Sequence, residues 1–319
     1  LLVLSLPGCG GFRDTKPQLP GNLDTLCMPD YASGFEMYRY DSSTLLRIVN
    51  PWQGADSVSQ WVFLSRDDEK PPKGFAGETI DVPVRRIVCM SSSYVAFLEA
   101  LGADSTICAI SGTGYIWSDK VRNRIAGGEI AEAGFDNSLN FEKLVALKPD
   151  VVFLYGLTGK NAVTDKLHEL GLKTVYIGDY VENNPLGRAE WITVFGEFTG
   201  RRELARTLFD SISNEYNRAK ALVSGVEKRP EVMLNAPWQD SWFVPGDRSY
   251  MVRLLEDAGG NYACRGVDSD QSRPISTETA FVAASQSDFW LSPGTATSLA
   301  ELNAMNPRFG SIPPVRNGN

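Results

Sequence analysis

Hydrophobic and polar residues alternate with a period of two in the first part of the chain. Phe35–Tyr40 shows this alternation, and Leu45–Asn50 and Trp61–Ser65 are rich in residues that favour strands. Such a pattern is typical of strands that bury one face. With a polar turn at residues 41–43, it predicts an antiparallel hairpin or a small sheet before residue 84.

From Val84 onward, short apolar runs alternate with segments of helical periodicity. The predicted strands are Arg86–Ser91, Thr106–Ser111, Val151–Tyr155 and Lys173–Ile177, and the predicted helices are Tyr94–Leu101, Asn140–Leu147 and Val163–Leu170. Gly102 and Gly171 follow two of these helices directly, as glycines that end helices do. Strands that alternate with helices predict a parallel α/β sheet.

A longer helical segment follows, from about Arg188 to Val223. Its apolar residues recur at the spacing of one helix face, from Trp191 to Phe198, and continue after Gly200. A helix of this length between two α/β units can serve as a stiff connector.

A second α/β unit is predicted after this connector. Its strands are Glu231–Leu234, Trp242–Val244 and Asp288–Leu291, and its helices are Tyr250–Ala258 and Thr277–Ala284. Near the end, Asn317-Gly318 is a turn signal that ought to lead into another strand. We therefore expect the last strand and the terminal helix of this unit to be missing from the sequence.

The first residues are similar to the end of a bacterial lipoprotein signal. An apolar stub, Leu1–Leu6, precedes Pro7-Gly8 and Cys9, the residue that would carry the lipid. The signal would not belong to the folded protein, and residues 12–26, rich in Pro, Gly and polar residues, would form a tether. The alternative is a frayed chain end with an incidental cysteine.

Composition excludes several classes of function. The net charge is −8 and the chain has no basic run, whereas affinity for nucleic acid comes largely from Lys and Arg on phosphates. The one histidine, His168, argues against a zinc site or a catalytic triad. It is expected to be a solvated residue near a helix C-terminus. We predict no metal site and no cofactor.

The five cysteines contain no C-x-x-C pair, which argues against metal ribbons and thioredoxin chemistry. Cys89 and Cys108 lie in apolar runs and are expected to be small core residues. A bridge between Cys27 and Cys264 is left open, because spacing gives no connectivity.

Four segments together resemble a known family. They are Arg86–Ser91 with the helix after it, Phe141–Val152, Val244–Gly260 and Ile275–Glu278. These segments resemble the ABC-transporter substrate-binding proteins for iron-siderophores, haem and cobalamin, which have two lobes joined by one long helix. The hairpin before Val84 resembles an N-terminal extension of Bacteroidetes-type members.

The resemblance implies an α/β fold of two Rossmann-like lobes joined by one long α-helix, with an N-terminal β-hairpin extension. The expected parts are a signal remnant and tether (1–26), the β extension (27–83), the first lobe (84–185), the connecting helix region (186–229) and an incomplete second lobe (230–319). The protein is expected to be periplasmic and held at the membrane by its lipid.

Ligands of open α/β sheets bind at the carboxyl ends of the strands, here at the cleft between the lobes. The loops expected there are rich in aromatic residues, which suit large flat ligands. Ser92 lies at a helix start beside them, and Arg273 and Lys160 are candidate partners for an anion. The predicted ligand-binding residues are Ser92, Tyr115, Trp117, Phe135, Tyr155, Trp238, Trp242 and Arg273.

The predicted function is therefore capture of an iron chelate, a siderophore or haem, for delivery to an ABC permease dimer with its ATPase. Cobalamin is the alternative ligand. Cobalamin-binding relatives tend to have a Trp near Arg273, whereas Ser272 stands here, which favours an anionic chelate. The resemblance also implies that one carboxylate on each lobe, Glu99 and Glu278, docks onto the permease.

Three other functions, two enzymatic and one adhesive, are alternatives to this one. An α/β hydrolase would need a G-x-S-x-G elbow, which is absent from the sequence. A dehydrogenase would need a third glycine after Gly112-Thr113-Gly114. A surface adhesin would be compatible with the lipid anchor alone. We predict that the protein is not an enzyme.

Overall fold

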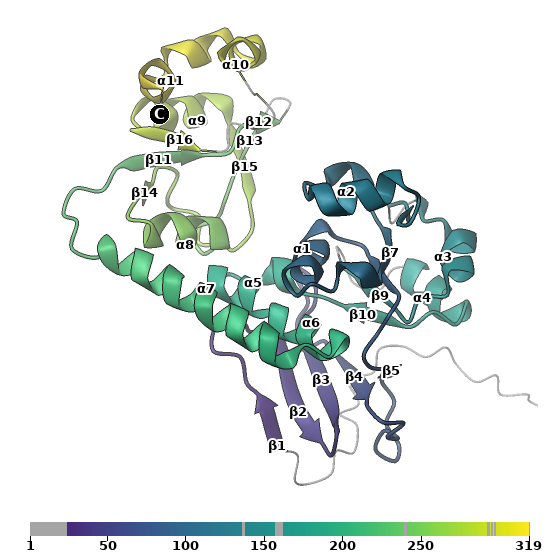
Figure 1. The fold of residues 1–319 in the computed structure, drawn as a ribbon. Helices are drawn as coiled ribbons and strands as arrows, with labels where there is room; N and C mark the ends of the chain where they lie inside the picture. Colours follow the sequence, from purple (N-terminus) through teal and green to yellow (C-terminus); the bar gives the residue numbers. More distant parts are fainter. Residues whose placement is uncertain are drawn as a thin grey trace, which may run out of the picture. The chain divides into compact units, whose positions relative to one another are not determined.

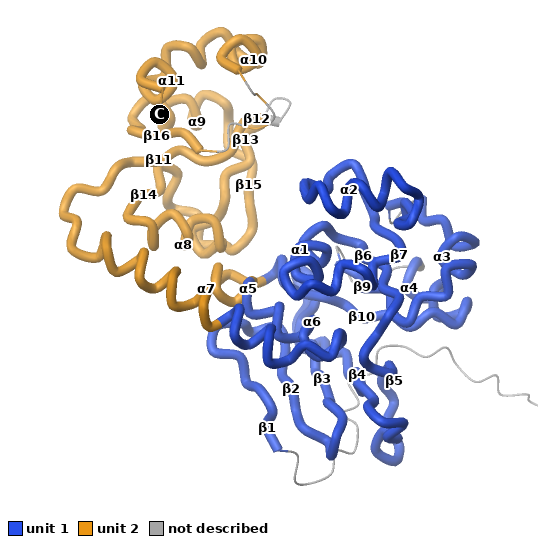
Figure 2. The backbone as a smooth tube through the Cα atoms, viewed as in Figure 1, with its two compact units in different colours: residues 1–181, 189–209 blue, residues 182–188, 210–319 orange. Residues whose placement is uncertain are grey.

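The computed structural model describes residues 24–135, 138–156, 162–238, 241–291, 294, 296 and 298–318. The chain divides into two compact units (Figures 1 and 2). Unit 1 comprises residues 1–181 and 189–209, and unit 2 comprises residues 182–188 and 210–319. The predicted fold class, two α/β lobes joined by a helix, is confirmed.

Unit 1 begins with a sheet of five strands in the order β1-β2-β3-β4-β5. All neighbours are antiparallel except β4 and β5, which are parallel. The predicted N-terminal extension is therefore larger than a hairpin. Its strands are β1 (Asp24–Cys27), β2 (Phe35–Tyr40), β3 (Ser43–Val49), β4 (Ser59–Ser65) and β5 (Glu78–Asp81).

A second sheet of unit 1 is parallel throughout and has the order β10-β9-β6-β7-β8. The strand order reverses between β6 and β9, which makes the carboxyl end of β6 a topological switch point. The strands are β6 (Ile87–Cys89), β7 (Ile107–Ile110), β8 (Ala131–Glu132), β9 (Val151–Leu154) and β10 (Thr174–Tyr176). The helices between them are α1 (Ser92–Ala100), α2 (Asp119–Ala126), α3 (Phe141–Leu147) and α4 (Ala162–Glu169).

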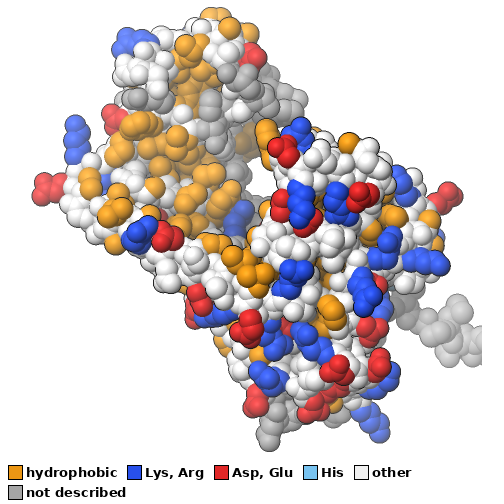
Figure 3. Space-filling view, in the orientation of Figure 1, with side chains coloured by type: hydrophobic (Ala, Val, Ile, Leu, Met, Phe, Trp, Pro, Cys, Tyr) orange, Lys and Arg blue, Asp and Glu red, His pale blue; other side chains and the backbone are white. Residues whose placement is uncertain are grey.

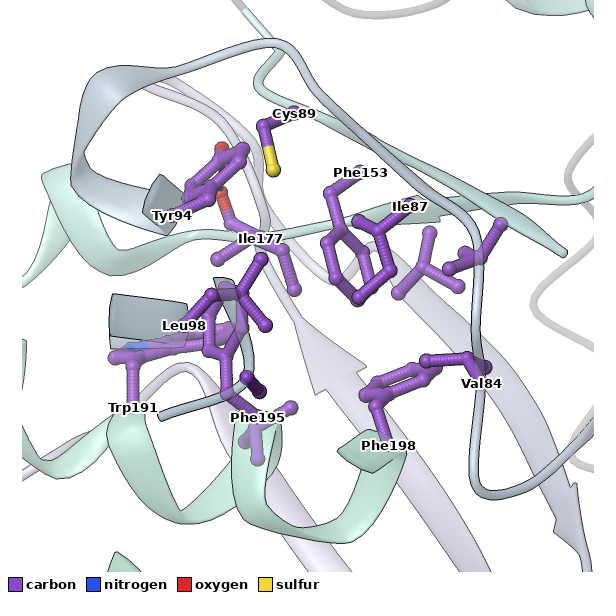
Figure 4. Close-up of a cluster of buried hydrophobic side chains, with 14 of the residues drawn as sticks. Val84, Ile87, Cys89, Tyr94, Leu98, Phe153, Ile177, Trp191, Phe195 and Phe198 are labelled. Carbon is purple, nitrogen blue, oxygen red and sulfur yellow. Dashed lines mark hydrogen bonds between the residues drawn. The ribbon is translucent and has the colours of Figure 1, made fainter. Parts of the chain in front are cut away.

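The two sheets of unit 1 share one hydrophobic core. The Phe153 ring on β9 lies 5.1 Å from Phe195 and 4.9 Å from Phe198 of helix α6 (Ile192–Thr199), and Figure 4 shows these rings facing one another. From the N-terminal sheet, Phe35 packs 5.0 Å from Trp191. Residues 27–83 are therefore folded into the first lobe and do not form a separate domain.

The helical segment after β10 is divided into three helices. The prediction of one continuous helix from about Arg188 to Val223 was therefore wrong. They are α5 (Pro185–Glu190), α6 and α7 (Arg202–Leu222). Gly200 ends α6 in a left-handed conformation with φ of 69°, which a glycine adopts at little cost. Helix α7, with 21 residues, passes from unit 1 to unit 2 and is the predicted connector.

Unit 2 contains a parallel sheet and an antiparallel one, each of three strands. The parallel sheet has the order β14-β11-β16, with β11 (Glu231–Leu234), β14 (Asn261–Tyr262) and β16 (Phe289–Leu291). The antiparallel sheet contains β12 (Pro237–Trp238), β13 (Ser241–Val244) and β15 (Arg273–Ser276). The helices are α8 (Tyr250–Asp257), α9 (Thr277–Ser285), α10 (Leu299–Met305) and α11 (Pro313–Asn317).

The Asn317-Gly318 pair, which was predicted to be a turn before a further strand, forms the end of helix α11. Gly318 has φ of 76°, and its N–H donates to the carbonyl oxygen of Pro314. The same dipeptide suits a hairpin turn and a helix end, because both require a residue in the left-handed region.

The exposed side chains differ between the two units. In the view of Figure 3, Lys, Arg, Asp and Glu are interspersed over unit 1, and hydrophobic side chains form broad areas over unit 2. Within the described part of the chain, every helix is too short or too polar to cross a membrane. Cys27 and Cys264 are free thiols in the described structure, each partly buried in its own unit.

Candidate functional site

The carboxyl edge of the parallel sheet in unit 1 brings together most of the predicted ligand-binding residues of that lobe. Ser92 follows β6, Tyr115 and Trp117 follow β7, Phe135 follows β8, and Tyr155 follows β9. Because all five strands are parallel, these residues emerge at one edge. This is the edge at which open α/β sheets bind ligands.

Three of these aromatic side chains are largely exposed. The exposed fraction is 91% for Trp117, 70% for Tyr115 and 51% for Phe135. Between the first two, Ile116 is buried in the core and anchors the loop. Single exposed apolar residues are common, but three large rings in two adjacent loops are typical of a binding surface.

The Tyr115 and Phe135 rings meet at Gly112. A Cβ atom on Gly112 would lie 2.9 Å from Cδ2 of Tyr115 and 3.3 Å from Cε1 of Phe135. Gly112 also has φ of 75°, a left-handed conformation that a side chain would strain. The glycine therefore lets two rings from different loops lie against one backbone position.

The Glu132 carboxylate, at the end of β8, accepts four hydrogen bonds from the two aromatic loops. Its Oε1 accepts from the N–H of Gly112 at 3.0 Å and of Gly134 at 2.9 Å. Its Oε2 accepts from the N–H of Thr113 at 2.8 Å and from its hydroxyl at 2.7 Å. Partial burial raises the pKa of Glu132, but these bonds outweigh it and the net pKa is lowered.

A second carboxylate holds the far end of the β7 loop. Oε1 of Glu99 on α1 accepts a hydrogen bond of 2.5 Å from the Ser118 hydroxyl. Ser118 in turn caps helix α2, because its Oγ accepts from the N–H of Val121 at 3.3 Å. Glu99 is half-buried, so this carboxylate is engaged within unit 1.

The serines after β6 begin helix α1. Ser91 is the N-cap, and its Oγ accepts from the N–H of Ser93 at 3.3 Å. The hydroxyls of these two serines also lie 3.0 Å apart. Ser92 is exposed, so its hydroxyl is the one that faces solvent at this helix start.

Tyr155 is half-buried and lies in contact with an aromatic residue that the sequence analysis missed. The rings of Tyr155 and Tyr180 pack edge to face at 5.5 Å, and the Tyr180 hydroxyl donates to the carbonyl of Gly156. Trp52, from the N-terminal sheet region, forms a parallel bridge with Gly156. The position of Tyr180, directly after β10, could have indicated it. The expected contact at Lys160 falls outside the described residues.

In unit 2, the structure corrects the prediction for Trp242. This ring has 0% exposure, and its N–H donates to the carbonyl of Leu234 at 3.1 Å. It packs against Trp290 and Phe309, so it belongs to the core and has no face for a ligand. Its neighbour Phe243 points the other way and is 40% exposed.

Arg273 is exposed at the start of β15, opposite Val244. The Trp238 backbone lies in β12, but its side chain is outside the described part. Glu278 lies in the first turn of α9 and forms an ion pair of 2.7 Å with Arg308. That guanidinium also lies over the Phe281 ring at 4.2 Å.

His168 is exposed in the last turn of α4, as predicted, and it also has two polar partners. Its Nε2 lies 2.7 Å from Oγ1 of Thr174 and 3.1 Å from Oε1 of Glu78. The hydrogen bond to Glu78 raises the pKa of His168. Among the residues that the structure describes, no cluster of three His, Cys, Asp or Glu side chains could hold a metal ion.

Comparisons with known proteins agree with this architecture. The family model described as periplasmic binding protein matches residues 87–319. An uncharacterised lipoprotein of Methanocaldococcus jannaschii is 27% identical over 90% of this chain and 74% of its own length. A periplasmic heme binding protein from Pseudomonas aeruginosa has a TM-score of 0.59 at 20% identity, covering 74% of this chain and 82% of that one.

A second solved structure, an ABC-type Fe3+-hydroxamate transport system from Saccharomonospora viridis, has a TM-score of 0.55 at 19% identity and covers 74% of this chain and 84% of that one. At these identities the solved structures show the shared fold alone. The family model, however, spans most of the chain, including the loops that carry Tyr115, Trp117 and Phe135. The chain belongs to the periplasmic binding protein family.

Proposed function

We propose that this chain is the substrate-binding protein of an ABC importer and that it captures an iron chelate, a siderophore or haem. The observation that carries the proposal is the exposed aromatic platform of Tyr115, Trp117 and Phe135 at the carboxyl edge of the parallel sheet. Flat, conjugated ligands gain both apolar burial and ring stacking on such a surface. Proteins of the same fold include ones described as binding heme or transporting Fe3+-hydroxamate.

An anionic chelate suits the charged residue predicted for the second lobe. Arg273 is exposed, and a guanidinium can form charge-assisted hydrogen bonds with carboxylates or catecholates. Removing it by Arg273→Ala should weaken an anionic chelate by about 1.5–3 kcal/mol. The neutral alternative, cobalamin, would be unaffected by this change.

The test is native mass spectrometry of the protein with hemin, ferrioxamine B and cyanocobalamin, followed by titration of Trp fluorescence with the ligand that binds. Trp117→Ala should weaken binding about fivefold or more, since a stacked aromatic contributes on the order of 1–3 kcal/mol. The matched control is Leu222→Ala, which removes an exposed hydrophobic side chain on α7. Equal affinities of Trp117→Ala and the unmodified protein would contradict the proposed platform.

The same proposal makes the protein a carrier without covalent chemistry, held at the membrane by Cys9 and delivering its ligand to a permease. We propose Glu278 and Glu99 as the docking carboxylates. Glu278 is exposed on α9, although Arg308 already pairs with it. Glu99 would have to give up its bond to Ser118.

The docking role is tested by the double variant Glu99→Lys with Glu278→Lys in a reconstituted importer. Transport and permease binding should fall while ligand affinity stays unchanged. Glu99 also supports the α2 cap, so replacing it could change the fold as well as docking. The single variant Glu278→Lys avoids this effect, and Glu256→Lys on α8 is its control. Normal transport by the double variant would rule out docking through these residues.

A further inference from the structure

The described residues of the two loops that carry the aromatic platform have little regular structure, and the β7 loop contains one short 3-10 turn, Thr113–Tyr115. Apart from the buried Ile116, the three exposed rings give these loops little core packing, so other contacts must help to fix their conformation. In the described structure, the most concentrated set of such contacts is the carboxylate of Glu132.

Each oxygen of Glu132 has a distinct task. Oε1 bridges the two loops, because it accepts from Gly112 in the β7 loop and from Gly134 in the β8 loop. Oε2 holds Thr113 through both its N–H and its hydroxyl. Two of the three backbone donors lie close to the rings: a Cβ atom on Gly112 would crowd both the Tyr115 and the Phe135 ring, and Gly134 is followed directly by Phe135.

We propose that Glu132 is a positioning residue of the ligand site. Its carboxylate fixes the two loops so that Tyr115, Trp117 and Phe135 form one platform, and it does this through backbone N–H groups without touching the ligand. This inference rests on the proposed function for its ligand, but the ordering of the loops can be measured without one. A platform that is ordered before binding saves the ligand the entropy cost of ordering it.

The experiment compares Glu132→Gln, Glu132→Ala and Thr113→Val with the unmodified protein. Thr113→Val removes one of the four bonds. Glu132→Gln keeps one acceptor oxygen but directs an NH2 group at N–H donors, and Glu132→Ala removes all four bonds. The matched control is Glu129→Gln, which makes the same charge change three residues away, where the carboxylate pairs only with Arg124 in the described structure.

Two readouts report on the loops directly, under conditions in which every variant is folded. The first is amide hydrogen exchange of Gly112, Thr113 and Gly134 by NMR, which should accelerate in the order Thr113→Val, Glu132→Gln, Glu132→Ala. The second is the 19F signal of 5-fluorotryptophan at position 117, assigned with Trp117→Phe, which should broaden or shift in the same order. Glu129→Gln should change neither.

Affinity for hemin is measured in parallel, well below the unfolding temperature of each variant. We expect Glu132→Ala to bind at least about tenfold more weakly, which corresponds to about 1.4 kcal/mol. A direct contact gives the opposite sign: if Glu132 faced the carboxylates of hemin, removing its charge would strengthen binding.

Unchanged hemin affinity in Glu132→Ala, or tighter binding, would overturn the positioning role. If the unmodified protein binds none of hemin, ferrioxamine B and cyanocobalamin, the proposed function fails, and the exchange data then decide the inference alone. In that case, unchanged exchange at Gly112, Thr113 and Gly134 would overturn it as well.

Discussion

Nε2 of His168 on helix α4 lies 3.1 Å from Oε1 of Glu78 on strand β5. This contact links a helix of the parallel α/β part of unit 1 to the N-terminal sheet. The histidine also lies 2.7 Å from the Thr174 hydroxyl. The exposed His168 side chain therefore also connects helix α4 with strand β5.

This contact makes the stability of unit 1 depend on pH. The hydrogen bond to Glu78 raises the pKa of His168 in the folded protein above its ordinary value. The group therefore adds stability that is fully present below the unfolded pKa, about 6.5, and is lost as the pH rises through the folded pKa. His168→Asn should lower the unfolding midpoint more at pH 5.5 than at pH 8.5, as thermal unfolding followed by circular dichroism will show.

Glu78→Gln is the companion variant, because it keeps a hydrogen-bond acceptor but removes the charge. It should abolish most of the pH dependence that His168 contributes. If both variants shift the midpoint equally at pH 5.5 and pH 8.5, the ion pair contributes nothing measurable.

A buried carboxylate supports the junction between the N-terminal sheet and helices α6 and α7. Glu197 accepts from the Thr44 hydroxyl at 2.9 Å and pairs with Arg66 and Arg202. Glu197→Ala leaves two arginines without their buried partner, and should destabilise the protein by about 3 kcal/mol. Urea unfolding measures the loss, with the exposed Glu203→Ala as control, and a difference below about 0.5 kcal/mol between the two variants would contradict this account.

Truncation of two adjacent residues of strand β13 should change the free energy of unfolding by very different amounts. Trp242→Ala should lower the free energy of unfolding by about 3–5 kcal/mol, because it empties a fully buried ring site. Phe243→Ala should change it by less than about 0.5 kcal/mol, because that ring is half exposed. Chemical unfolding of both variants distinguishes them, and a larger stability loss for Phe243→Ala would invert the assigned faces of the strand.

The lipid anchor is tested on the full-length precursor. Cys9→Ser should release the protein into the soluble fraction, because the thiol that would carry the acyl chains is gone. Fractionation followed by immunoblotting measures the change, and Cys27→Ser is the control, since that thiol is partly buried in the core of unit 1. Retention of Cys9→Ser on the membrane would show that another feature holds the protein there.

Much of the fold could be predicted because its local signals agree with its packing. The predicted helix Asn140–Leu147, for example, matches helix α3, and the Asn140 side chain caps it by accepting from the N–H of Lys143 at 3.0 Å. Helix α2 was not predicted, since its polar sequence carries only one buried residue, Val121. Its beginning is fixed by Ser118 and by the distant Glu99, a tertiary contact that periodicity does not reveal.

The candidate site was predicted less completely, for a similar reason. A residue such as Tyr115 could be placed at the carboxyl edge from strand order alone. Whether a ring faces solvent depends on strand register, and the pairing of β13 with β15 turns Trp242 inward and Phe243 outward. The four bonds of Glu132 could not be foreseen, because its partners lie up to 20 residues away in sequence.

The N-terminal sheet is not a detachable module of this protein. It shares its core with the parallel sheet, as the contact of Phe35 with Trp191 illustrates, and its Trp52 reaches Gly156, beside Tyr155. A chimera in which only the residues after 84 are replaced by those of a relative that lacks the sheet would therefore lose packing in this core. The neighbour of Tyr155 would also change. Engineering of ligand preference in this protein has to treat the described residues of unit 1, within 24–181 and 189–209, as one folding unit.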